Sequence, residues 1–185
     1  MRTTFWASLL WLVSLAWAPA QADAVPPALP KVQAELAAPG RTRLRITFAA
    51  QAPQSLVVAR DAQVPAQAEA DRVDVVAALD TGVVVLVETY PSRLNGGAGQ
   101  CGAGEERFLR VVSTAPPAHQ TYSRKLASCW RDTLLDTEFG DEGLRWSPAS
   151  RELRIEWLSG PTGGKPESLT LRVAPDGRVK EVKPA

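Results

Sequence analysis

The residues best equipped for chemistry lie together in one stretch of the chain, from Tyr90 to Val112 (YPSRLNGGAGQCGAGEERFLRVV). This stretch contains five of the 13 glycines, one of the two cysteines, and the adjacent carboxylates Glu105 and Glu106. A thiol can act as a nucleophile, paired carboxylates can act as acid and base, and glycine N–H groups can bind phosphate. Each of these chemistries requires particular residues or secondary structure in the neighbouring sequence.

The glycines lack the flanking strand and helix that a nucleotide-binding motif requires. Gly97 to Gly102 matches G-x-G-x-x-G, but that fingerprint must leave a strand tightly and open a helix. Here residues 91–95 separate the motif from the preceding apolar run, and the strand-like RFLRVV follows it. No lysine follows the glycines, as a phosphate-binding loop would require. The match is one of composition only, and we expect no cofactor.

The cysteines favour a disulfide over catalysis. The chain has only two, Cys101 and Cys129, and such a pair in an exported protein is typically bonded. A catalytic thiol needs a histidine base, and the single histidine, His119, lies in a proline-flanked segment typical of a solvated loop. We therefore predict a Cys101–Cys129 disulfide. A free thiol at Cys101, paired with His119, is the alternative.

The same scarcity of ligands argues against a metal site. Zinc would need both cysteines as thiolates together with His119, without any of the usual close ligand spacings. Calcium would have to bind the acidic segment 132–142, whose carboxylates lack the regular spacing of a calcium loop. We interpret that segment as a solvated acidic turn and predict no metal.

The carboxylates leave two interpretations open. On a strand, the neighbours Glu105 and Glu106 point to opposite faces, whereas glycosidase chemistry needs two carboxyl groups about 5 to 9 Å apart that face one sugar. A hydrolase would therefore need a further acid such as Glu88 or Asp132. The structural interpretation, which we favour, has one glutamate accept hydrogen bonds from glycine N–H groups or pair with Arg93, and so pin the loop.

Short β-strands are the elements that must hold this stretch in place. Period-two alternation on both sides of a Pro-Gly pair at 39–40 predicts a hairpin, with a short helix at 31–38 as the competing interpretation. β-Branched runs at 73–79 and 83–89 predict a second hairpin, and the continuous VVVLV within it indicates burial on both faces. Further strands are expected at 55–59, 107–113, 144–147, 153–157, 168–173 and 178–182, and a strand or short helix at 122–130.

Together these signals predict an all-β fold. About nine short, mostly antiparallel strands with turn signals between them are typical of a sandwich, a meander or a small barrel. No long segment has the 3.6-residue period of a helix. We expect a single β-rich domain over residues 31–185 with one disulfide, preceded by an extended proline-rich leader at 25–30.

The first 24 residues have the pattern of a secretory signal peptide. A basic residue at position 2 precedes an apolar run from Phe5 to Ala18, and small residues up to Ala24 provide the cleavage site. The run has 14 residues, fewer than the roughly 20 that span a bilayer. We therefore expect cleavage, no integral membrane segment after it, and a periplasmic or secreted protein.

The composition and the lack of a recognisable catalytic motif together reduce the number of function classes to consider. The net charge of +1 provides no basic excess for nucleic acid, so we expect no nucleic-acid partner. A long loop on a β-rich domain with a disulfide favours an exported non-catalytic binding protein, of inhibitor, immunity or envelope accessory type. Such a protein would recognise a protein or cell-wall partner. A carboxylate-based envelope hydrolase and a structural envelope subunit are the alternatives.

The binding residues that we expect belong to the long loop, with further exposed positions around residues 160–165. They are Arg93, Asn95, Gln100, Glu105 and Glu106. In the hydrolase alternative, Glu105 or Glu106 would instead act as the acid or base.

Overall fold

A computed structural model describes residues 28–49, 51–95 and 101–182, which form an all-β protein, as the sequence predicts. Its strands make three antiparallel sheets. The first sheet contains β1 (Lys31–Ala38), β2 (Arg41–Thr47) and β3 (Gln54–Ala59). The second contains, in spatial order, β4 (Arg72–Ala78), β5 (Val83–Pro91), β6 (Glu105–Ser113) and β7 (His119–Ser128). The third contains β8 (Leu134–Leu135), β9 (Leu144–Ser147), β10 (Glu152–Ser159), β11 (Glu167–Val173) and β12 (Val179–Val182).

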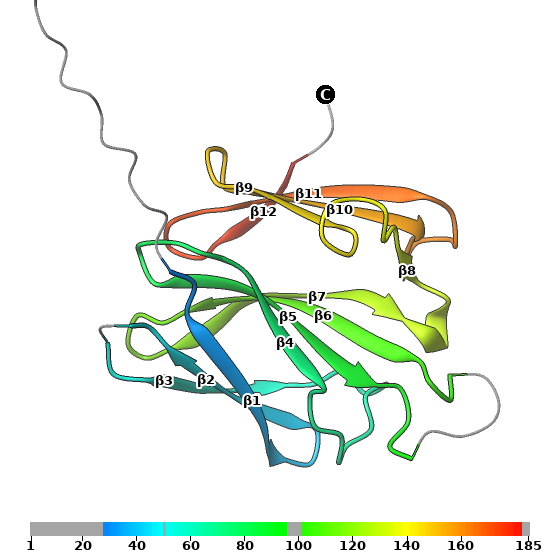
Figure 1. Cartoon of the computed structure of the whole chain (residues 1–185), viewed down its shortest axis with the longest axis horizontal. Helices are drawn as coiled ribbons and strands as arrows, with labels where there is room; N and C mark the ends of the chain where they lie inside the picture. The colour runs from blue at the N-terminus through cyan, green and yellow to red at the C-terminus, as the bar shows by residue number, and fades with distance from the viewer. Residues whose placement is uncertain (1–27, 50, 96–100, 183–185) are drawn as a thin grey trace, which may run out of the picture.

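The three sheets lie on top of one another as three layers (Figure 1). The second sheet is the middle layer and is called the central sheet below, because the third sheet covers one of its faces and the first sheet covers the other. Each interface is a hydrophobic core. The larger core, toward the third sheet, includes Val85, Leu109, Leu126, Leu153, Ile155 and Trp157. The smaller core, toward the first sheet, includes Leu44, Ile46, Leu56, Val84 and Leu86.

Strand β5 shows how one sheet can serve two cores. Successive side chains on a strand point to opposite faces, so Val83, Val85 and Val87 pack in the larger core while Val84 and Leu86 pack in the smaller one. All five side chains are buried. The expectation that the continuous run VVVLV is buried on both faces is therefore confirmed.

The hairpins follow from local turn chemistry. Gly40 and Gly82 both have positive φ, at +72° and +81°, which glycine adopts without the steric penalty that a Cβ atom brings. Gly40 closes the turn between β1 and β2, and Gly82 closes the turn between β4 and β5. The hairpins predicted at both turns are confirmed. The strands expected at 144–147 and 153–157, and at 168–173 and 178–182, also pair as hairpins, β9 with β10 and β11 with β12.

The structure decides between the alternatives left open for two predicted elements and adds one strand. Residues 31–38 form the strand that the predicted hairpin requires, not the competing short helix, because alternate residues such as Val32 and Ala34 pack against the smaller core. The segment 122–130 is strand up to Ser128, and the short 3-10 helix η1 (Cys129–Arg131) follows. The acidic segment, expected to be a solvated turn, contains the two-residue strand β8. The described residues hold twelve strands, where about nine were expected.

The chain before β1 is only partly described. Residues 28–30 precede β1 without regular structure, while the predicted signal peptide and the first part of the leader lie outside the described residues. Within the described ranges, no helix is long and apolar enough to cross a membrane.

Candidate functional site

The predicted disulfide is present and closes one corner of the molecule. Cys101 and Cys129 are bonded, with their Cα atoms 5.5 Å apart, and they join the connection that precedes β6 to the end of β7. Gly104 passes so close that a Cβ atom there would lie 2.6 Å from the Cβ atom of Cys129. Glycine is therefore required at this position by the close approach of the disulfide.

The disulfide leaves no free thiol at Cys101, which the alternative of a catalytic cysteine paired with His119 requires. Both thiols are consumed in the bond, and the described residues contain no free cysteine. His119 is exposed at the start of β7, where its Nδ1 atom lies 2.9 Å from the carbonyl oxygen of Pro117. The interpretation of Cys101 and His119 as a catalytic pair is therefore wrong. An oxidised pair is compatible with an extracytoplasmic protein.

Glu105 and Glu106 lie on opposite faces of β6, as the strand geometry requires. Glu105 is exposed, whereas Glu106 is fully buried and accepts a hydrogen bond from the hydroxyl of Ser92 at 3.0 Å. The backbone N–H of Ser92 in turn donates to the carbonyl of Gly104 at 2.8 Å. Glu106 thus holds the two ends of the glycine-rich connection together, but through Ser92 rather than through Arg93, one of the two partners suggested by the sequence.

Lys125 neutralises Glu106 from the neighbouring strand β7. Its Nζ atom lies 3.6 Å from Oε2 of Glu106 and 3.1 Å from Oδ1 of Asp61, and it also donates to the side chain of Gln63. Burial raises the pKa of Asp61, but the backbone N–H of Gln63 and the ammonium of Lys125 outweigh this effect and hold it below its usual value. The ammonium therefore ties the connection between β3 and β4 to the base of the glycine-rich connection.

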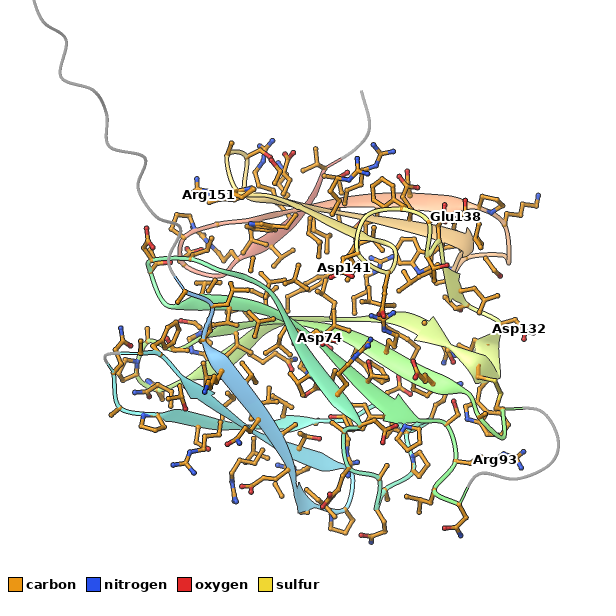
Figure 2. All side chains as sticks on the ribbon, viewed as in Figure 1. Asp74, Arg93, Asp132, Glu138, Asp141 and Arg151 are labelled. Carbon is orange, nitrogen blue, oxygen red and sulfur yellow. A yellow bond between two sulfur atoms is a disulfide. The ribbon has the colours of Figure 1, made fainter. Side chains whose placement is uncertain are left out.

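The outer face of this corner is exposed and carries the residue types that dominate binding interfaces. Trp130 is 39% exposed, and Leu94 is 51% exposed. The guanidinium of Arg93 stacks over the Trp130 ring, 5.0 Å from its centroid, and Nε1 of Trp130 donates to the carbonyl of Ser92 at 3.3 Å. Figure 2 shows Arg93 at the edge of the molecule. Arg93, Leu94, Asn95 and Trp130, all exposed or partly exposed, are called the corner surface below.

A hollow of about 640 Å³ lies beside the corner surface. Its lining includes Trp130, Ser92, Asp61 and the loop that follows β3. Arg60 holds this loop in place, because its guanidinium donates to the backbone carbonyls of Ala66 and Ala68. The hollow is therefore lined in part by a loop that Arg60 holds in place and in part by Trp130.

Of the five residues predicted from the sequence, the structure describes four, and these lie in three places. Arg93 and Asn95 are exposed at the corner, and Glu106 is buried beneath it. Glu105 lies apart from them and lines a smaller hollow of about 360 Å³ next to β8. Gln100 lies outside the described residues. Their roles in binding remain predictions.

Sequence reasoning missed three residues that complete this corner. Trp130 follows Cys129 directly, so a predicted disulfide already placed it beside the glycine-rich connection. Asp61 and Lys125 carried no such signal, because an ion pair between residues 64 positions apart depends on how the sheets pack. Of these three residues, only Trp130 could therefore have been found from the sequence, by way of the predicted disulfide.

A second charged cluster joins the central and third sheets. Glu142, between β8 and β9, lies 2.7 Å from Arg72 of β4 and 2.6 Å from Arg107 of β6. Arg72 also pairs with Asp74 at 2.7 Å. The hydrogen bond from Arg72 lowers the pKa of Glu142, and although burial opposes this effect, the charge of Arg107 reinforces it. This cluster links the central and third sheets and is called the clasp below; it consists of Arg72, Asp74, Arg107 and Glu142.

The remaining tests for a known activity are negative. In the three described ranges, no group of three or more histidine, cysteine or acidic side chains is arranged to hold a metal ion. Comparisons with protein families, with curated proteins and with solved structures find nothing that matches the chain. Only the geometry and chemistry of the corner therefore indicate a function.

Proposed function

We propose that this chain is an exported, non-catalytic binding protein whose protein partner contacts the corner surface. The observation that carries the proposal is the exposed stack of Arg93 on Trp130, held beside the Cys101–Cys129 disulfide. Tryptophan and arginine are the side chains most enriched among residues that dominate binding energy. A disulfide at the base of such a pair supports recognition on a rigid scaffold.

The supports beneath the corner surface reduce the entropy lost on binding. Trp130 is fixed by its hydrogen bond to Ser92, and Ser92 is fixed by Glu106. Side chains that are already ordered lose little conformational freedom when a partner binds, and each ordered rotamer is worth roughly 0.5 to 1.5 kcal/mol. Polar side chains in the lining of the adjacent hollow, such as Asp61 and Gln63, offer hydrogen bonds at the rim of such an interface.

Two observations favour binding over hydrolysis. Glu105 and Glu106 point to opposite faces of β6 and so do not face one substrate. The second carboxylate near Glu106 is that of Asp61, but Lys125 lies between them and Glu106 has no exposed surface. A buried, neutralised carboxylate is better suited to holding the loop than to transferring a proton to a substrate.

The compartment belongs to the same proposal. The signal-peptide pattern of the first 24 residues and the Cys101–Cys129 disulfide support a periplasmic or secreted location. An envelope protein is accordingly the partner that we propose. A cell-wall glycan is the competing partner and is separated by the experiment.

The test uses the mature oxidised protein with a photoreactive amino acid at position 94, where the leucine side chain is exposed. We expect illumination in envelope extract to crosslink one protein, and the double variant Arg93→Ala, Trp130→Ala to reduce the yield at least about tenfold. Arg178→Ala with Leu158→Ala removes an exposed arginine and an exposed apolar residue elsewhere and serves as the matched control.

The outcomes separate the candidate functions. Crosslinking that is equal in the corner variant and the control variant would contradict the proposed surface. Retention on purified peptidoglycan, lost in the corner variant, would replace the protein partner with a glycan. Release of sugar or peptide fragments from peptidoglycan, abolished by Glu105→Gln, would establish the hydrolase instead.

A further inference from the structure

A groove runs along one side of the molecule, where an edge strand of each layer reaches the surface. β1 is an edge of the first sheet, β4 is an edge of the central sheet, and β9 pairs only with β10 among the described strands of the third. Residues of all three strands line one groove of about 890 Å³. Figure 2 shows Asp141 above Asp74 of β4, in the space between the third and central sheets.

The floor of the groove is an open strand edge. Within the described residues, β4 pairs with β5 on one side and with no strand on the other. Alternate residues of an edge strand direct their N–H and C=O groups outward, where another strand can pair with them. The groove therefore offers backbone hydrogen bonds as well as side chains.

The two edges of the central sheet differ in how well they are protected. Bulges are one device by which proteins prevent unwanted pairing at an edge. β7 has two irregularities, where Thr121 and Leu126 are skipped in the pairing with β6. β4 has one, at Val76, so Arg72–Val75 is a regular edge. By this criterion β4 is the less protected of the two edges, although β1 lies close to it without pairing with it.

Apolar side chains contribute to the lining of the groove on both sides of β4, beside the charged ones. Leu144 and Trp146 contribute from the third-sheet layer, and Leu29 and Val32 contribute from the start of the first sheet. Leu29 is 55% exposed. A chain lying beside β4 would therefore contact apolar side chains both above and below, as β5 does in the interior.

The charges of the groove balance. It is lined by three basic and three acidic side chains: Lys31, Arg72, Arg107, Asp74, Asp141 and Glu142. Four of these pair with one another in the clasp. Lys31 and Asp141 form no ion pair with the described residues. The complementary ligand has no net charge and carries one acidic and one basic group for these two.

We propose that this groove binds an extended segment of a partner protein, which adds to the central sheet as a further strand beside β4. The regular edge and the seven-residue length of β4 set the paired segment at about four to seven residues, at roughly 3.3 Å per residue. Its side chains alternate between the two walls, so both sets are apolar, and its ends carry one acid and one base. No residue lines both this groove and the corner hollow, so the two proposals stand independently.

The probe is a capped eight-residue peptide with six central valine, isoleucine and threonine residues between one glutamate and one lysine. We expect it to bind the mature oxidised protein and to slow hydrogen exchange at backbone amides of β4. Two further peptides carry N-methyl groups on one or the other set of alternate backbone nitrogens. One set should weaken binding at least about tenfold because it removes the donors to β4, and the other should leave binding unchanged.

Matched protein variants locate the site. Trp146→Ala, in the wall of the groove, should weaken binding of the probe about tenfold, whereas Trp130→Ala at the corner should leave it unchanged. The peptide pair requires no protein variant and so remains decisive if Trp146→Ala fails to fold.

Three results would overturn the proposal. The first is an equal effect of the two N-methylated peptides, which would indicate apolar contact without strand addition. The second is absence of binding by the unmodified peptide at about 1 mM, which would place its Kd above that concentration. The third is a dimer of the protein alone with protected β4 amides, since a second copy would then fill the groove.

Discussion

At the scale of single residues, the most informative pair is Glu88 with Arg110, buried between the first and central sheets. The guanidinium lies 2.5 Å from the carboxylate, and both side chains are almost completely inaccessible to solvent. Arg110 also donates to the backbone carbonyl of Ala59 in β3, at 2.9 Å. A buried charge is tolerated only when it is paired and hydrogen-bonded, and Arg110 meets that requirement by tying two layers together.

Arg110→Ala should therefore destabilise the protein strongly, because it leaves the carboxylate of Glu88 buried without a partner. We expect a loss of about 3 to 5 kcal/mol in the free energy of unfolding. Arg154→Ala removes one partner of an exposed pair and should cost at most about 1 kcal/mol. Urea unfolding at pH 7 measures both. Equal losses in the two variants would contradict this account.

Tyr90 shows that the same region of the central sheet is closed to solvent. Its hydroxyl lies 2.7 Å from Oγ1 of Thr42 in β2. Burial raises the pKa of Tyr90, and the charge of Glu88 adds to the rise. The phenol therefore stays protonated well above neutral pH and keeps its hydrogen bond between the first and central sheets.

At the scale of elements, the disulfide and the clasp hold parts that the sheets alone do not. Cys101 and Cys129 are 28 positions apart, so their bond restricts a sizeable loop in the unfolded chain. The double variant Cys101→Ser, Cys129→Ser should lose about 3 to 4 kcal/mol on the chain-entropy model. Urea unfolding of the oxidised protein and the variant measures this difference. A variant as stable as the oxidised parent would contradict the expectation.

The clasp makes stability depend on pH through Glu142. Its pKa in the folded protein is held below its ordinary value of 4.5, so ionised Glu142 adds stability above about pH 4.5. That contribution is lost as the pH falls through the lowered folded pKa. Glu142→Gln removes the titrating group, so the variant should show a weaker fall in its urea midpoint between pH 6 and pH 3 in parallel measurements. An identical fall in the parent and the variant would assign the pH dependence to other groups.

The elements were readable from the sequence wherever the signal was local. Alternation and turn residues identified the hairpins, and the run VVVLV indicated a strand buried on both faces. The order of the layers was not readable, because a strand's pattern shows that a face is buried without showing which sheet covers it. Likewise, the pairing of Lys125 with Asp61 and the groove beside β4 arise only when separate hairpins pack together.

At the scale of the whole molecule, the central sheet makes the two cores interdependent. Trp157 of β10 illustrates the coupling, because its Nε1 atom donates to the carbonyl of Leu126 in β7 at 2.6 Å. The first sheet is attached in the same way by Thr42 and Arg110. Loss of either outer layer would expose one apolar face of the central sheet, so the three layers should unfold together.

Leu44→Ala tests this cooperativity, because Leu44 is fully buried in the core of the first sheet. We expect a loss of about 2 to 5 kcal/mol. The tryptophans of the described ranges, Trp130, Trp146 and Trp157, all lie outside the first sheet. Their fluorescence should nevertheless shift to the same lower urea midpoint as far-UV circular dichroism. Two separated transitions would mean that the first sheet unfolds on its own.

Because successive residues of β5 face the two cores in turn, the number of residues in this strand decides which core each side chain enters. Inserting one residue before Val85 would exchange the faces of every side chain after it and turn Glu88 away from Arg110, toward the third sheet. Inserting two residues would restore the faces, and an insertion in the turn at 80–82 would leave them untouched. The chain can therefore change length over evolution at the ends of its hairpins, while its middle strand can vary in residue type but hardly in length.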